Sequence, residues 1–171
     1  METASFMRRL GTLLLLAFFQ VLFLNRIALF GYVTPLFYIW MIARFDSSMK
    51  RSGILLWSFF LGLTIDLFSG TPGLNAASAT LLAMFQPGIM KLFVSLERHE
   101  SVVPCSAVMG RSFVSYLLLL TTLHHTVYFI LLSIPLGDWA VLALKIVFST
   151  LLTFIFMLVT EHVSMSPVPK R

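Results

Sequence analysis

The sequence predicts an all-α, polytopic membrane protein with about six transmembrane helices and both termini in the cytoplasm. Hydrophobic residues make up 58% of the 171 residues and charged residues only 11%, whereas about a quarter of the residues of soluble domains are charged. Polar residues gather between apolar stretches of about 15 to 23 residues, which is the length that a helix needs to cross about 30 Å of hydrocarbon. The chain is therefore built for lipid.

Six apolar segments are expected to be helices, because unpaired backbone groups find no water inside a bilayer. The second segment contains Gly31 and Pro35 and follows the first after only Asn25 and Arg26. It is either a kinked span or partly re-entrant, so five spans plus a re-entrant segment is an alternative. The six segments are 10–24, 27–43, 53–68, 74–94, 112–134 and 139–160.

From the composition of the two ends we expect no second domain. Arg8 and Arg9 before the first apolar run resemble a secretory signal, but no small-x-small cleavage site follows, which favours an uncleaved first span. We expect one transmembrane helical domain over 1–163 and a short cytoplasmic tail over 164–171. Cys105 is the only cysteine, so no intrachain disulfide can form.

The basic residues define the orientation. Ten lie in alternate connections or near the termini, and the other connections hold only Arg26. This bias predicts that both termini and the two larger loops are cytoplasmic. The basic residues stand beside apolar segments and form no patch interleaved with aromatics, so nucleic acid is not an expected partner and membrane lipid is. The ten are Arg8, Arg9, Arg44, Lys50, Arg51, Lys91, Arg98, Arg111, Lys170 and Arg171.

Turn chemistry predicts which helices are neighbours. The connections 69–73 and 135–138 are short and rich in Gly and Pro, so segments three and four, and five and six, should form antiparallel hairpins. Segment four is rich in small side chains, which allow another helix to approach closely, and we expect it to be the central helix. The expected helix-packing positions are Gly62, Ala76, Ala79 and Ala83.

Four ionisable residues fall inside the predicted spans: Asp66, His124, His125 and Lys145. Such residues need a partner or a wet cavity, and their depths predict a pair between Asp66 and Lys145. We favour a structural or partner-related role over a proton or cation relay. The two histidines are about 100° apart on a helix, so they cannot easily share a metal ion and only one can face a given neighbour. We therefore expect a lone polar bridge.

Catalytic equipment is missing from the sequence. The usual hydrolase, metalloprotease and phosphate-binding motifs are absent, and we expect no catalytic, cofactor-binding or metal-binding residues. Most acidic residues lie in loops or at span ends, where we expect them to be solvated. These are Glu2, Asp46, Glu97, Glu100 and Glu161.

Several short strings follow one another along nearly the whole chain. They are Gln20 to Asn25, Leu29 to Gly31 with Pro35, Phe60 to Asp66, Gly73 to Ala76, His124-His125 with Phe129, and Ser149-Thr150 with Thr153. Each string has low specificity by itself, but in their joint order and spacing the chain resembles MreD, the small membrane subunit of the bacterial rod-shape and cell-elongation machinery. One departure is the wholly apolar stretch 129–132, where the family usually has an acidic residue.

This resemblance implies a non-enzymatic scaffold in the cytoplasmic (inner) membrane that controls cell shape and the placement of peptidoglycan synthesis. The implied partners are an MreC-like bitopic membrane protein and, within the complex, an MreB-like filament, a SEDS glycosyltransferase and a class B penicillin-binding protein. The family fold is also similar to the substrate-binding subunits of energy-coupling-factor vitamin transporters. The alternative function is therefore such a subunit, with a small molecule bound near Asp66 and the histidines. An intramembrane enzyme is a third, less favoured hypothesis.

Overall fold

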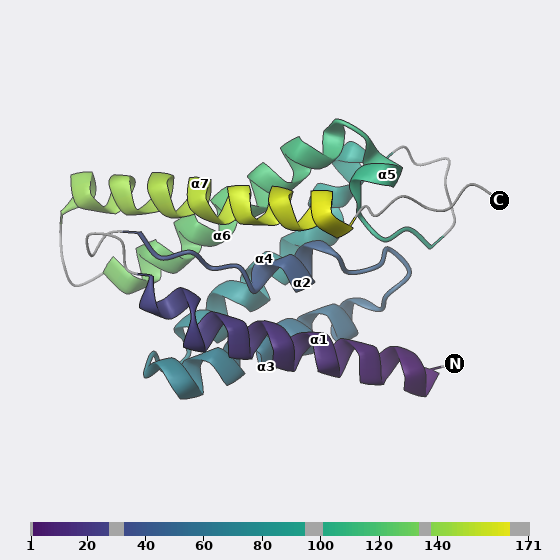
Figure 1. Ribbon diagram of the computed structural model, residues 1–171, viewed down its shortest axis with the longest axis horizontal. Coiled ribbons are helices and arrows are strands. Elements are labelled where there is room, and N and C mark those ends of the chain that lie inside the picture. Colours follow the sequence, from purple (N-terminus) through teal and green to yellow (C-terminus); the bar gives the residue numbers. More distant parts are fainter. Residues whose placement is uncertain (1, 28–32, 95–100, 134–137, 165–171) are drawn as a thin grey trace.

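The structure is a computed structural model that describes residues 2–27, 33–94, 101–133 and 138–164 (Figure 1). The predicted all-α class is confirmed, and five helices are long and apolar enough to cross a membrane. Three shorter helices lie between them: η1 (Leu24–Arg26), α2 (Ile39–Ala43) and α5 (Ser106–Met109). The five long helices are α1 (Glu2–Leu22), α3 (Arg51–Ser69), α4 (Leu74–Phe93), α6 (Ser112–Ser133) and α7 (Trp139–Ser164).

The long helices run up and down the bundle (Figure 1). Helices α1, α3 and α6 start at one end, on the right of Figure 1, and α4 and α7 finish there. We call this the basic end, because Arg8 and Arg9 lie near the start of α1, Arg51 begins α3, Arg111 directly precedes α6, and Arg44 lines one cavity with Arg8 and Arg9. Apart from Ser164, the predicted tail, 164–171, lies outside the described residues, and so do three of the predicted basic residues, Arg98, Lys170 and Arg171.

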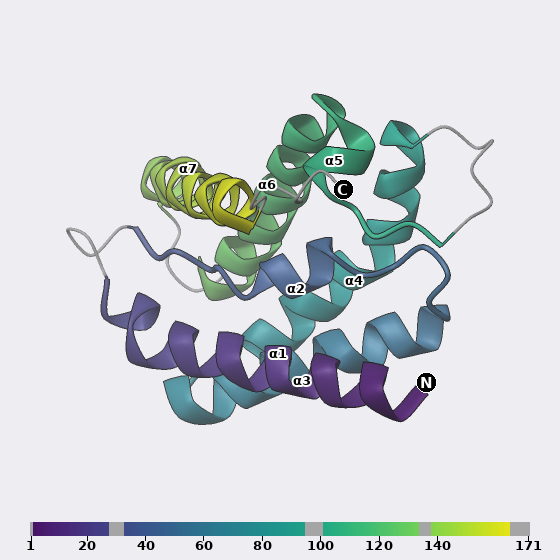
Figure 2. The same ribbon diagram turned by 45° about the vertical axis from the view of Figure 1, so that its right-hand side comes forward.

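Both predicted hairpins are confirmed, since α3 packs on α4 and α6 packs on α7. Helix α4 also packs against α6 and α2, which confirms its central position (Figure 2). The turn between α3 and α4 depends on Gly70 and Gly73, whose φ angles of 66° and 78° are in the left-handed region that glycine adopts without strain. The second turn, at 134–137, lies outside the described residues.

Gly62 lets α3 and α4 approach each other closely. A Cβ atom added there would lie 2.5 Å from the Asn75 carbonyl oxygen and 2.6 Å from the Ala76 Cα. Ala79 and Ala83 follow on the same helix, and both are fully buried. The small side chains of this face thus allow α3 and α4 to pack more closely than larger side chains would permit.

The segment 27–43 differs from the helix predicted there. In its described part, 33–38 is not helical, and only Ile39–Ala43 forms a short helix, α2. Pro35 has no N–H to donate and disfavours helical geometry at the residue before it. A second spanning helix, expected over 27–43, is therefore not formed over its described part. We call the non-helical stretch 33–38, which ends in the turn before α2, the extended segment.

Candidate functional site

The extended segment lies in the interior, where its backbone needs hydrogen-bond partners. Gln20 of α1 supplies two of them. Its Nε2 donates to the Pro35 carbonyl oxygen at 2.8 Å, and its Oε1 accepts from the Phe37 N–H at 2.9 Å. Gln20 is fully buried, so its amide replaces the partners that a helix would have provided.

Two hydroxyl groups of α7 accept the neighbouring backbone amides. The Thr34 N–H donates to Ser149 Oγ at 3.0 Å, and the Leu36 N–H donates to Thr153 Oγ1 at 3.0 Å. This arrangement explains how non-helical backbone is accommodated within an apolar bundle, which requires every polar group to be paired with protein. The extended segment is thus fastened between α1 and α7.

His125 extends this network to α6. Its Nδ1 lies 2.8 Å from the Thr121 carbonyl oxygen, which can only accept, so Nδ1 carries the proton. Its Nε2 then accepts from the Thr153 hydroxyl at 3.2 Å. Thr153 therefore donates to the histidine and accepts from Leu36, and both capacities of its hydroxyl are used.

Tyr38 is the centre of a second network. Its hydroxyl donates to Asn75 Oδ1 at 3.0 Å and lies 3.0 Å from His124 Nε2. Because a phenol has one proton to donate, Nε2 of His124 is the donor in the second bond. The other ring nitrogen, Nδ1, has no hydrogen-bond partner in the described chain, and the ring is fully buried within the core.

Asp66 anchors this second network at the start of α4. Its Oδ1 accepts from the Thr71 hydroxyl at 2.8 Å and from the Asn75 backbone N–H and Nδ2 at 2.9 Å each. Its Oδ2 accepts from the Ala76 N–H at 2.9 Å. Since Gly73 precedes α4 and has no side chain to cap it, Asp66 of α3 caps α4 from across the turn.

The predicted pair between Asp66 and Lys145 is wrong. The recorded hydrogen bonds of Asp66 all come from Thr71, Asn75 and Ala76, and Lys145 is half-buried on α7 without an ion pair in the described chain. The carboxylate instead occupies the N-terminus of α4, where the helix dipole also favours negative charge. The two histidines face different neighbours: His124 meets Tyr38 and His125 meets Thr153.

At the basic end, Glu161 contradicts the expectation of a solvated charge. It is only 4% exposed, its Oε2 lies 2.6 Å from Arg44 Nη1, and its Oε1 accepts the N–H and hydroxyl of Ser106 at 2.8 Å each. It fastens α2 and α5 to the end of α7. Nearby, Tyr116 donates to the Ala43 carbonyl oxygen at 2.8 Å and accepts from Gln86 at 3.0 Å.

Comparison with known proteins gives no relative. No family model matches the chain, and no curated protein or solved structure shows significant similarity to it. The geometry of the described residues and the sequence must therefore carry the functional argument.

Chemically, these networks fix positions. Asp66, His124 and His125 are at most 4% exposed, and their bonds run to other segments of the chain, to the turn before α4 or to backbone. Within the described ranges, no group of three or more His, Cys, Asp or Glu residues is placed to hold a metal ion. What the arrangement does is lock α1, the extended segment, α4, α6 and α7 into one relative placement.

Proposed function

We propose that this chain is a non-enzymatic scaffold of the bacterial cell-elongation complex, as its resemblance to MreD implies. It would hold an MreC-like bitopic protein in the cytoplasmic membrane, close to an MreB-like filament, a SEDS glycosyltransferase and a class B penicillin-binding protein. In this role it sets where peptidoglycan synthesis takes place, and the chemistry belongs to its partners.

One observation supports a scaffold most directly: the polar side chains of the interior are used to dock segments of the chain. Gln20, Ser149 and Thr153 bind backbone amides or carbonyls of the extended segment, and Asp66 caps α4. Such groups confer a defined helix arrangement, which a scaffold needs in order to present fixed surfaces to its partners. The assignment to cell elongation rests on the sequence resemblance.

The proposed orientation places the basic end in the cytoplasm. Arg8, Arg9, Arg44, Arg51 and Arg111 gather there, and the excess of Lys and Arg on the cytoplasmic side is the main determinant of membrane topology. Between the two ends most outward-facing residues are apolar, as a lipid-facing surface requires; examples are Phe18, Leu67, Phe148 and Ile155.

The alternative, a vitamin-binding transporter subunit, needs a ligand cavity near Asp66 and the histidines. Asp66 and His125 are fully engaged by groups of the chain itself, and only Nδ1 of His124 and Oγ1 of Thr150 are buried without a partner in the described part. This favours the scaffold.

Depletion in the host, with plasmid-borne rescue, tests the proposal. We expect depleted rods to become spheres and the full chain, isolated in mild detergent, to bring down the bitopic partner. Rods of normal shape together with a chain that binds no such partner contradict the scaffold. A small molecule found bound in native mass spectra, together with an ATPase module as co-purifying partner, would establish the transporter subunit.

A further inference from the structure

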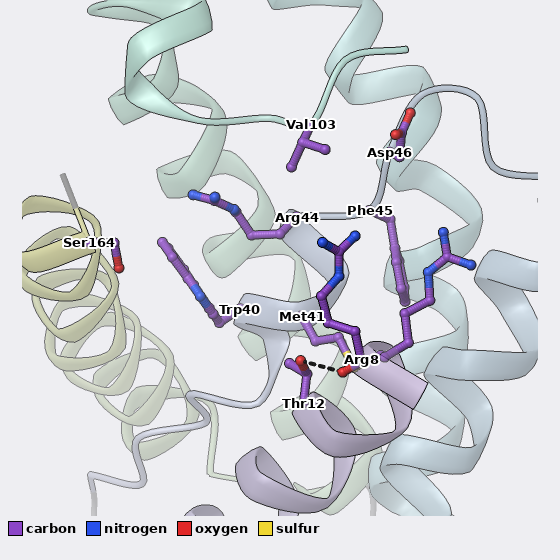
Figure 3. Close-up of a pocket in the computed structure, with 10 residues that line it drawn as sticks. Arg8, Thr12, Trp40, Met41, Arg44, Phe45, Asp46, Val103 and Ser164 are labelled. Atoms are coloured by element: carbon purple, nitrogen blue, oxygen red, sulfur yellow. Dashed lines mark hydrogen bonds between the residues drawn. The ribbon is translucent and has the colours of Figure 1, made fainter. Parts of the chain in front are cut away.

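A cavity of about 370 Å³ opens at the basic end. It lies between α1, α2 with the loop that follows it, and the end of α7. Figure 3 shows Arg8 and Thr12 entering it from α1, Trp40 and Arg44 from the α2 region, Asp46 from the loop that follows, and Ser164 from α7. Arg9 also lines it. Three arginines thus face one hollow in a chain that has only 12 basic residues.

The charge in this cavity is not balanced. Arg44 is paired with Glu161, and its guanidinium lies 5.3 Å from the centre of the Trp40 ring, which holds it in place. Asp46, which also lines the cavity, accepts hydrogen bonds from Ser101 and Ser48 and feels the charge of Arg9, although no ion pair joins them. Arg8 and Arg9 have no ion pair within the described residues, so three arginines against Glu161 and Asp46 leave the cavity with an excess of positive charge.

The cavity also lies at the end of a candidate membrane-spanning helix, the level at which lipid phosphates would be expected. Helix α1 passes directly from Arg8 and Arg9 into its apolar part. Arg8, Leu15 and Leu22 are spaced seven residues apart, so they share one face of the helix, and Leu15 and Leu22 are 68% and 46% exposed. Two turns of helix rise about 10 Å. A lipid whose phosphate lies at Arg8 would therefore place its acyl chains along these leucines.

We propose that this cavity binds the phosphate headgroup of an anionic lipid from the leaflet at the basic end. Arg8 and Arg9 contact the phosphate oxygens, because guanidinium groups match phosphate geometry with paired N–H donors. Arg44, fixed by Glu161 and Trp40, forms the far wall. The lipid fills the space between α1 and the end of α7 and becomes part of the bundle.

The test uses the full chain purified in mild detergent and titrated with phosphatidylglycerol or phosphatidylcholine, with bound lipid counted by native mass spectrometry. The variant is R8Q/R9Q. The matched control is R51Q/R111Q, which removes the same charge from two exposed arginines at the same end, outside this cavity. Labelling of the only cysteine, Cys105, in reconstituted vesicles checks that both variants keep the orientation of the parent chain, and equal thermal midpoints check folding.

We expect the parent chain to prefer phosphatidylglycerol, R8Q/R9Q to bind it about thirtyfold more weakly, and R51Q/R111Q to stay within about threefold. An equal loss in both variants, or no loss in R8Q/R9Q, overturns the site. Glycerol 3-phosphate is the soluble probe: displacement of the lipid at equal concentration would assign the cavity to free phosphates and overturn the lipid. If R8Q/R9Q does not fold, the single variant R8Q must weaken binding at least threefold, or the proposal fails.

Discussion

Arg44 Nη1 lies 2.6 Å from Glu161 Oε2, and this ion pair joins the short helix α2 to the last turn of α7. Because Glu161 is almost fully buried, a variant that removes one side chain of the pair leaves the other without a partner in a poorly solvated site. The pair closes the basic end of the bundle and holds α2 in place directly after the extended segment.

The first prediction concerns this pair. We expect E161Q to lower the free energy of unfolding by about 1.5 to 3 kcal/mol, the range for hydrogen bonds to charged groups. Reversible unfolding in mixed micelles measures it. A double-mutant cycle with R44Q should give a coupling of at least about 1 kcal/mol, and a coupling near zero would mean that the two side chains act independently.

The second prediction concerns Thr153, which accepts the Leu36 N–H and donates to His125. T153V keeps the shape of the side chain but removes both bonds, and we expect a loss of about 1 to 3 kcal/mol. Hydrogen exchange should also show faster exchange of the Leu36 amide. The matched control is T160V on the same helix, since within the described residues the Thr160 hydroxyl bonds to the Phe156 carbonyl of its own helix and to no other segment. Equal effects of the two variants would refute the fastening role of Thr153.

The third prediction concerns the contact between α3 and α4. A methyl group at Gly62 would overlap the Asn75 carbonyl and the Ala76 Cα, so G62A should destabilise the chain by about 1 to 3 kcal/mol through forced backbone separation. Gly88 provides the control, because a Cβ there meets nothing within 4 Å. G88A should be neutral or slightly stabilising, as alanine favours helices, and a comparable loss in G88A would disprove the packing argument.

The fourth prediction separates structure from function at Asp66. D66N turns one accepting oxygen into a donor that faces backbone N–H groups, and we expect about 1.5 to 3 kcal/mol of lost stability. In the host, the level of the protein and the recovery of its partner should fall together. A D66N chain of normal abundance and normal partner binding that nevertheless fails to support rod shape would point to a relay of protons.

The fifth prediction concerns pH at the loop before α3. Partial burial acts to raise the pKa of Asp46, but hydrogen bonds from Ser101 and Ser48 outweigh it, and the net pKa is lowered. A lowered pKa means that the carboxylate adds stability at every pH above its unfolded value of about 4, and that this contribution is lost as the pH falls further. The difference in thermal midpoint between the parent and D46N should be constant from pH 5 to 8 and shrink towards pH 3. A difference that changes between pH 6 and 8 would exclude Asp46 as its source.

The sequence predicted the features that depend on apolar length and turn chemistry. Helices α3, α4, α6 and α7 lie where the apolar runs place them, and the Gly and Pro connections identified both hairpins. The small side chains of segment four correctly marked the central helix. These features are local, so the residues that cause them are close together in the chain.

What the sequence could not supply was the partner of each polar group. Asp66 was assigned to Lys145 by depth alone, yet its carboxylate caps a helix that begins eight residues further along. Gln20 and Tyr38 were missed, although a polar side chain in an apolar segment is the signal that could have found them. The partner of Glu161 was missed as well, although an acidic residue at the basic end is itself a sign of an ion pair. Each partner lies in another segment, and no spacing rule connects them.

The extended segment also dictates an order of events during synthesis. Thr34 precedes its acceptor Ser149 by 115 residues, which a ribosome needs roughly 6 to 20 s to add. Throughout this interval the amides of Thr34 and Leu36 lack their final acceptors, so the segment cannot settle in hydrocarbon when it first leaves the translocation channel. The hydrogen bonds of this early segment are thus completed only when the last helix has been made. A chain cut short before α7 would present unpaired backbone to the quality-control proteases of the membrane.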